Sequence, residues 1–139
     1  MIVAYSDGSC RGVGGGPGGW AFHIQDTETN EKELVSGGID WTTNNQAELW
    51  AIYHLMLHVN AKSNILIVTD SRNVIGWLQR GWHRKQEHIN SLCLAIEEAK
   101  KVKEIRWAFS KVKGHAGHQL NELVDQAAYR EASIILRQK

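Results

Sequence analysis

Four acidic residues are the candidates for chemistry in this sequence: Asp7, Glu48, Asp70 and Asp125. Asp7 and Asp70 come at the ends of short apolar runs, whereas Glu48 and Asp125 fall near the starts of predicted helices. Because an unpaired buried carboxylate is costly, acids at the ends of buried strands suggest a shared partner. If the four converge, their repulsion requires cations, and oxygen-only ligands favour Mg²⁺ or Mn²⁺ over zinc. Two such ions held by carboxylates are a known means of in-line phosphodiester hydrolysis.

The elements that must position these acids follow from the hydrophobic pattern. We predict strands over 2–6, 20–25, 32–39, 65–69 and 105–112, and helices over 44–59, 71–79, 86–101 and 121–137. Three antiparallel strands come first, and two more strands then alternate with helices. This order predicts an α/β fold with a mixed five-stranded sheet and helices on both faces, in a single domain over 1–139. In such sheets, residues at strand ends beside helix N-termini usually form the site.

The two strand-end acids stand in short motifs that also have ordinary structural interpretations. After Asp7, Gly8 would let a ligand approach the backbone and Ser9 can donate a hydrogen bond, although an Asp-Gly pair is also a common turn. Asp70 or Ser71 could simply cap the following helix. The repeated arrangement of an acid after an apolar strand favours a functional role for both acids.

The segment before Glu48 is a run of hydroxyl and amide side chains. Free N–H groups at the predicted helix start could hold a phosphate near Thr43 and Asn44. The amides of Asn44, Asn45 and Gln46 could contact bases or ribose hydroxyls. The alternative is a plain helix start, with Thr43 or Asn44 as the N-cap and Glu48 in the first turn.

Two histidines, His115 and His118, lie in a predicted glycine-containing loop before Asp125. A loop histidine can move and transfer protons near neutral pH. A zinc site is disfavoured, because this pair has no cysteine near it and only distant carboxylates. We therefore expect no zinc.

The tryptophans fall into groups. We expect three to lie in the core or to be half-buried: Trp20, Trp50 and Trp107. Trp41 fits either a buried or an exposed position. Trp77 and Trp82 flank Arg80 beside a basic cluster, where aromatic faces and cations suit contacts with nucleic acid. The alternative for Trp77 is that it packs its helix onto the sheet.

Charge and cysteine content narrow the class of protein. Sixteen Lys and Arg against fifteen Asp and Glu give a net charge of +1. The bases still gather locally, at 80–85, 100–106 and 111–113, as patches that could bind a polyanion or simply be solvated helix faces. Two distant cysteines suit a reducing compartment. With no signal-peptide pattern and no membrane-length apolar run, we expect a cytoplasmic protein. A monomer is the default expectation.

Together these motifs resemble type 1 ribonuclease H. The matching segments are 5–10, 42–45 with Glu48, 69–71, and 112–118 followed by Asn121, Glu122 and Asp125. They occur in the family's order and cover nearly the whole chain. The resemblance implies a metal-dependent endonuclease that cuts the RNA strand of RNA–DNA hybrids and leaves 5′-phosphate and 3′-hydroxyl ends.

The resemblance also assigns roles to residues. It implies that Asp7, Glu48, Asp70 and Asp125 bind two Mg²⁺ ions, with Mn²⁺ as an alternative, and that Asp7 bridges both. His115 matches a mobile histidine that helps proton transfer or product release. Ser9, Asn44 and Asn45 match residues that touch the minor groove of the hybrid, and Thr43 matches part of a pocket for a DNA phosphate. Trp77 or Trp82 would lie by the DNA channel.

The chain departs from the family pattern in two places. Val13-Gly14 stands where an Asn-Pro pair is usual, so one hybrid contact is missing. The segment between Trp77 and Ile89 is short, which leaves a reduced version of the family's basic helix and loop. Two other interpretations of the function remain open. The protein could be another nuclease, resolvase or transposase of the same broad fold, or a hybrid-binding module without activity.

Overall fold

The computed structural model describes residues 1–112 and 119–139 and contains a sheet and helices in the predicted order. Its elements are β1 (Ile2–Cys10), β2 (Gly16–Asp26), β3 (Lys32–Thr42), α1 (Asn44–His58), β4 (Asn64–Thr69), α2 (Arg72–Leu78), α3 (Glu87–Val102), β5 (Arg106–Lys111) and α4 (Gln119–Gln138). The strand order is β3-β2-β1-β4-β5. β1, β2 and β3 pair antiparallel, and β4 and β5 run parallel to β1. The predicted mixed five-stranded sheet is confirmed.

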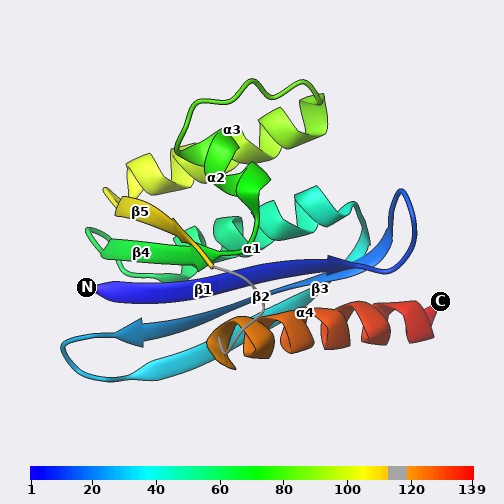
Figure 1. The fold of residues 1–139 in the computed structure, drawn as a ribbon, viewed down its shortest axis with the longest axis horizontal. Coiled ribbons are helices and arrows are strands. Elements are labelled where there is room, and N and C mark those ends of the chain that lie inside the picture. The colour runs from blue at the N-terminus through cyan, green and yellow to red at the C-terminus, as the bar shows by residue number, and fades with distance from the viewer. Residues whose placement is uncertain (113–118) are drawn as a thin grey trace.

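Helices cover both faces of this sheet (Figure 1). α1 packs against β1 and β2, and α3 packs against α1 on the same side. α4 lies on the opposite face, against β1, β2 and β3. The larger core lies between the sheet and α1 and α3, with Phe22, Leu49, Ile52 and Ile67 fully buried. Among the described residues, no helix combines the length and the apolar content needed to cross a bilayer.

The first three strands are longer than predicted: β2 begins at Gly16 and not at Trp20, and β3 ends at Thr42 and not at Ile39. β1 continues through Asp7 to Cys10, because the backbone of this segment pairs with residues 18–21 of β2. Only residues 11–15 connect the two strands. Our prediction that β1 ends before Asp7 was therefore wrong. It rested on the apolar run, whereas the hydrogen bonds of a sheet are made by the backbone and do not require apolar side chains.

Helical spacing in the sequence predicts that one face of the last helix points inward, with Leu120, Leu123, Val124, Ala127, Ala128 and Ala132 on it. The structure confirms this face except at the first turns of α4. Val124, Ala127, Ala128 and Ala132 are buried as expected. Leu123 is 38% exposed, so its assignment to the inward face was wrong. The helix lies very close to β2, since a Cβ on Gly19 would stand 2.2 Å from the carbonyl oxygen of Ala128. That proximity favours small inward residues such as alanine over leucine.

Candidate active site

Gly8 allows α1 to approach β1 closely enough for the acids of the two elements to meet. A Cβ on Gly8 would stand 2.2 Å from the carbonyl carbon of Ala47 and 2.3 Å from the backbone nitrogen of Glu48. Any other residue at this position would push the helix away from the strand. The side of Gly8 that carries no side chain therefore faces α1. The resulting close approach of α1 to β1 places Glu48 beside Asp7, which precedes Gly8 in β1.

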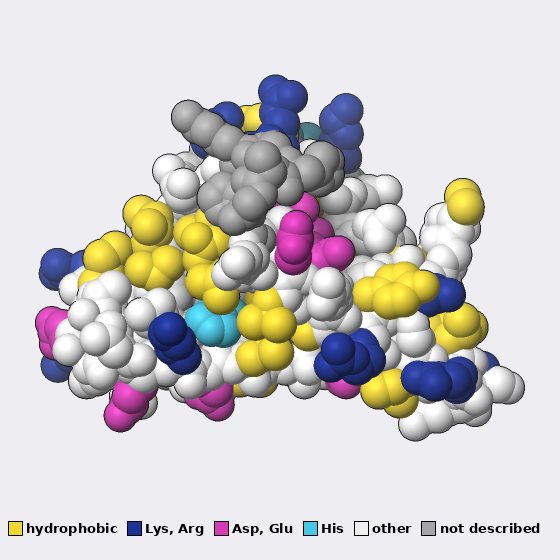
Figure 2. Space-filling view, turned by 60° about the horizontal axis from the view of Figure 1, so that its bottom comes forward, with side chains coloured by type: hydrophobic (Ala, Val, Ile, Leu, Met, Phe, Trp, Pro, Cys, Tyr) yellow, Lys and Arg dark blue, Asp and Glu magenta, His cyan; other side chains and the backbone are white. Residues whose placement is uncertain are grey.

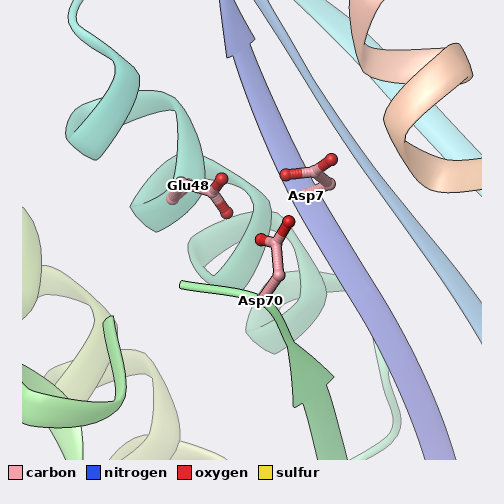
Figure 3. A group of neighbouring side chains, drawn as sticks. All are labelled: Asp7, Glu48 and Asp70. Atoms are coloured by element: carbon pink, nitrogen blue, oxygen red, sulfur yellow. The ribbon is translucent and has the colours of Figure 1, made fainter. Parts of the chain in front are cut away.

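Three of the four predicted acids form one cluster. One carboxylate oxygen from each of Asp7, Glu48 and Asp70 lies within 4.8 Å of the others. Figure 3 shows these side chains pointing toward one another from β1, from α1 and from the residue that follows β4. The predicted position of Asp70 directly after a buried strand is correct, since β4 ends at Thr69.

Burial makes this cluster electrostatically strained. Asp7 is only 4% exposed, and burial raises its pKa from the ordinary 3.8 to about 7. The negative charge of Asp70 and the carboxyl group of Asp125 add to this rise. The carboxyl group of Glu48 opposes this rise most, and the Gly8 N–H, which donates to Asp7 Oδ1 over 2.9 Å, opposes it to a smaller extent. Burial, followed by the charge of Asp7, also raises the pKa of Glu48 well above its usual value.

Asp125 lies at the edge of the cluster and not inside it. The residue is exposed on α4, and it is not one of the three acids that share the 4.8 Å group. Its carboxyl group is nevertheless near enough to contribute to the raised pKa of Asp7. The structure therefore brings three acids together and places the fourth beside them, on α4, which lies on the opposite face of the sheet from α1 (Figure 1).

The cluster has the properties of a site for a hard divalent cation. All its donors are carboxylate oxygens, which suit Mg²⁺ or Mn²⁺. Glu48 Oε2 is shielded from solvent and has no hydrogen-bond partner among the described residues. A buried acceptor without a donor is unfavourable, and a cation would satisfy it. Figure 2 shows acidic side chains gathered near the middle of one face of the molecule, with Lys and Arg side chains on two sides of them.

The residues before Glu48 form a capped helix start. Thr43 is the N-cap of α1: its hydroxyl accepts from the Gln46 N–H, and the Gln46 side chain accepts from the Thr43 N–H. The predicted N-cap is confirmed, but its partner is Gln46, and no acid stands in the first turn of the helix. Glu48 is thus left free to face Asp7.

The two asparagines that follow the cap lie differently. Asn44 is exposed, whereas Asn45 is half-buried and accepts a hydrogen bond over 3.2 Å from Asn73 on α2. Asn73 was not singled out from the sequence. No pattern marks it, because the contact joins two helices that are distant in the chain. Ser9, in β1, is partly exposed.

Ser71, and not Asp70, caps α2. The Ser71 hydroxyl accepts from the Val74 N–H over 3.2 Å. The alternative in which Asp70 serves only as a helix cap is therefore wrong, and the Asp70 carboxylate remains available to the cluster. His115 and His118 lie outside the described residues, so their predicted roles stay predictions.

The tryptophans lie largely as expected. Trp20 is buried, and Trp50 and Trp107 are half-buried. Trp41, which fitted either position, is 61% exposed. Trp77 is partly buried and packs against the main core, as its structural interpretation predicted. Trp82 packs on α2, because a Cβ on Gly76 would stand 2.1 Å from its ring.

Comparison with known proteins agrees with this fold and identifies the family. The sequence model of the RNase H family matches residues 1–133 of the 139. The chain belongs to the ribonuclease H family. As a ribonuclease H, it is an enzyme of the nuclease class.

Curated relatives agree with the assignment to the ribonuclease H family, and solved structures share the fold. A ribonuclease H of Rhodopirellula baltica is 36% identical, with 94% of this chain and 91% of that protein covered. One of Hyphomonas neptunium is 39% identical, with 92% and 89% covered. RNase H1 of Halobacterium salinarum superposes with a TM-score of 0.78 at 21% identity, over 96% of this chain and 98% of that one. LC11-RNase H1, solved in complex with an RNA/DNA hybrid, gives 0.78 at 22% identity, over 98% and 99%.

Proposed function

We propose that this ribonuclease H hydrolyses the RNA strand of RNA–DNA hybrids and leaves 5′-phosphate and 3′-hydroxyl ends. The observation that carries the proposal is the cluster of Asp7, Glu48 and Asp70, placed in a chain that belongs to this family. The structural relative LC11-RNase H1 binds such a hybrid, which supports the same substrate here. The two alternatives from the sequence, another nuclease of similar fold and an inactive binding module, are disfavoured by family membership and by the intact acids.

The acids are proposed to bind two Mg²⁺ ions, with Mn²⁺ as an alternative. Asp7 would be shared between both ions, with Glu48, Asp70 and Asp125 around it. When bound, such ions activate a water molecule and stabilise the leaving oxygen of a phosphodiester. The chain's own contribution is to hold the carboxylates together before substrate arrives: Gly8 sets the distance between α1 and β1, and the Ser71 cap leaves Asp70 free.

Several residues are proposed to bind the hybrid. Ser9, Asn44 and Asn45 would contact ribose 2′-hydroxyls and base edges in the minor groove, where amides and hydroxyls can distinguish RNA from DNA. Thr43 would contact a DNA phosphate at the start of α1. Gly8 would contribute through its backbone, and Trp77 or Trp82 would line the DNA side.

His115 is proposed to assist turnover without binding metal. We expect His115→Ala to slow turnover and to retain hybrid binding in a gel-shift assay. Complete loss of binding would contradict that role.

The experiment that tests the function is a cleavage assay with an RNA–DNA hybrid labelled on each strand in turn. The protein would be incubated with Mg²⁺, with Mn²⁺ and with a chelator, beside duplex DNA, duplex RNA and junction substrates. We expect metal-dependent cutting of the RNA strand only, and loss of cutting in Asp70→Asn. Asp40→Asn, which changes an exposed acid of β3, is the matched control and should cut normally.

Two results would contradict the proposal. Cutting of duplex DNA or of junctions in preference to the hybrid would indicate another nuclease of this fold. Binding of the hybrid without cleavage in either metal, by a protein shown to be folded, would indicate a binding module.

A further inference from the structure

A surface pocket of about 390 Å³ lies at the junction of α2 and β5, and three of its four lining residues are cations: Arg72, Arg80 and Lys111. The fourth is Ile75, which is 5% exposed and gives the pocket an apolar wall. Arg72 follows Asp70 by two residues. Lys111 pairs across β4 and β5 with Thr69, the residue that precedes Asp70. The pocket therefore lies next to the acid cluster.

Contacts within the fold join the segments that carry these cations. The side chain of Gln79 at the end of α2 accepts a hydrogen bond from the Phe109 N–H of β5 over 3.0 Å, which ties the segment carrying Arg80 to the strand carrying Lys111. The Arg72 guanidinium lies 5.7 Å from the centroid of the Trp82 ring.

The Trp82 ring itself is fixed, because it packs on Gly76, one turn after Arg72 in α2. The segments around the pocket are thus joined to one another within the fold, and the three cationic side chains that they carry are exposed.

The charges of the pocket are uncompensated. None of Arg72, Arg80 and Lys111 forms an ion pair within residues 1–112 and 119–139, whereas neighbouring Arg84 is paired with Glu97. Three like charges around one pocket repel each other, and an anion placed among them would relieve that repulsion. Arg offers several donors in a planar fork that matches phosphate oxygens, and Lys adds a point charge.

We propose that this pocket, which we call the Arg72–Lys111 pocket, binds a backbone phosphate of the nucleic acid beside the one that is cleaved. The inference rests on the proposed function. An acid cluster repels a polyanionic strand, and cations next to it offset that repulsion. The pocket is separate from the start of α1, because Asn73 projects from α2 toward Asn45 while Arg72 and Ile75 line the pocket.

The ligand of the pocket is a phosphodiester group, from either the RNA or the DNA strand.

The test compares Lys111→Gln and the double variant Arg80→Gln/Lys111→Gln with Arg106→Gln. Arg106 is an exposed cation at the opposite end of the same strand, β5, so it controls for loss of one charge. In hybrid cleavage, we expect Lys111→Gln to raise KM roughly fivefold and the double variant to raise it further. The slope of log(kcat/KM) against log[salt] should become shallower by about 0.9 per lost phosphate contact. Arg106→Gln should match the wild-type protein in both quantities.

A second arm identifies the strand. Hybrids that carry one neutral methylphosphonate linkage, at successive positions in the RNA strand or in the DNA strand, would be cleaved by wild type and by Lys111→Gln. When the methylphosphonate stands at the position that occupies the pocket, wild type and Lys111→Gln should have the same KM. The neutral linkage has already removed the phosphate charge that Lys111 would contact. If the KM difference disappears with a linkage in the RNA strand, the pocket binds an RNA phosphate, and if it disappears with a linkage in the DNA strand, the pocket binds a DNA phosphate.

The outcomes separate this inference from the proposed function. If the wild-type protein does not cut the hybrid, the proposed function fails. If it cuts the hybrid, but KM and salt slope in the double variant equal those of Arg106→Gln, the Arg72–Lys111 pocket does not bind phosphate and the inference is overturned. Circular dichroism of each variant establishes that the comparison is between folded proteins.

Discussion

The raised pKa of Asp7 predicts that neutralising this acid stabilises the metal-free protein. In the unfolded chain the carboxyl group has its ordinary pKa of 3.8, whereas burial raises it to about 7 in the folded protein. Between these values the folded state binds more protons than the unfolded state, so the free energy of unfolding falls as pH rises from about 4 to 7. Above that range the loss is complete. Asp7→Asn removes the titrating group, so its free energy of unfolding should not show this decrease.

The size of the effect follows from the displacement of the pKa. Three units at about 1.4 kcal/mol each correspond to about 4 kcal/mol for an isolated group. The titrations of Asp7 and Glu48 are coupled, and burial together with the charge of Asp7 raises the pKa of Glu48, so part of the penalty would remain on Glu48. We therefore expect Asp7→Asn to be more stable than wild type by about 1–3 kcal/mol at pH 8. The asparagine oxygen can keep the hydrogen bond from the Gly8 N–H.

The assay is urea unfolding followed by circular dichroism, in a chelator, at intervals from pH 4 to pH 8. Asp40→Asn, at an exposed acid of β3, is the control and should follow the wild-type curve. The difference between Asp7→Asn and wild type should be largest at pH 8 and should shrink toward pH 4. If Asp7→Asn is no more stable than wild type at pH 8, or if the difference does not depend on pH, the argument that burial strains this cluster is refuted.

Three further predictions concern the same region. Adding Mg²⁺ at pH 8 should raise the melting temperature of wild type but hardly that of Asp7→Asn, and equal shifts in the two proteins would place the ion elsewhere. Gly8→Ala should destabilise the fold by roughly 1–3 kcal/mol in urea unfolding, since its Cβ would meet Ala47 at 2.2 Å, and a variant as stable as wild type would contradict that contact. Thr43→Ala should cost about 1 kcal/mol through loss of the N-cap, measured in the same way, whereas an unchanged stability would mean that the cap contributes little.

The sequence predicted the order and type of the elements because their signals are local. Apolar runs such as Ile65–Val68 and the capped start of α1 at Thr43 depend on residues close together in the chain. The extent of β1 was not predictable in the same way. Asp7 and Gly8 belong to that strand because of their pairing with Ala21 and Trp20, which is a contact across the sheet. The glycine-rich composition of the segment concealed it.

The site was predictable as a set of residue types but not as an arrangement. The positions of Asp70 after β4 and of Glu48 in α1 could be inferred from spacing alone. The distance between Glu48 and Asp7 depends on how closely α1 packs on β1. That close packing is possible because Gly8 has no Cβ. The offset of Asp125 depends on where α4 lies on the far face of the sheet, and no local pattern carries that information.

The acids of this site are held together by the fold and not by attraction among themselves. Burial disfavours the charged forms of these acids most, and repulsion between their charges adds to the cost, yet the close contact of α1 with β1 and the end of β4 fix their positions. Replacing one acid by its amide therefore removes a repulsion and leaves the surrounding contacts in place, whereas replacing Gly8 leaves every acid intact but separates them. The two kinds of variant should thus lose activity with opposite changes in stability. If both lost activity with the same change in stability, the cluster would not be a preorganised site that the fold holds against its own charge.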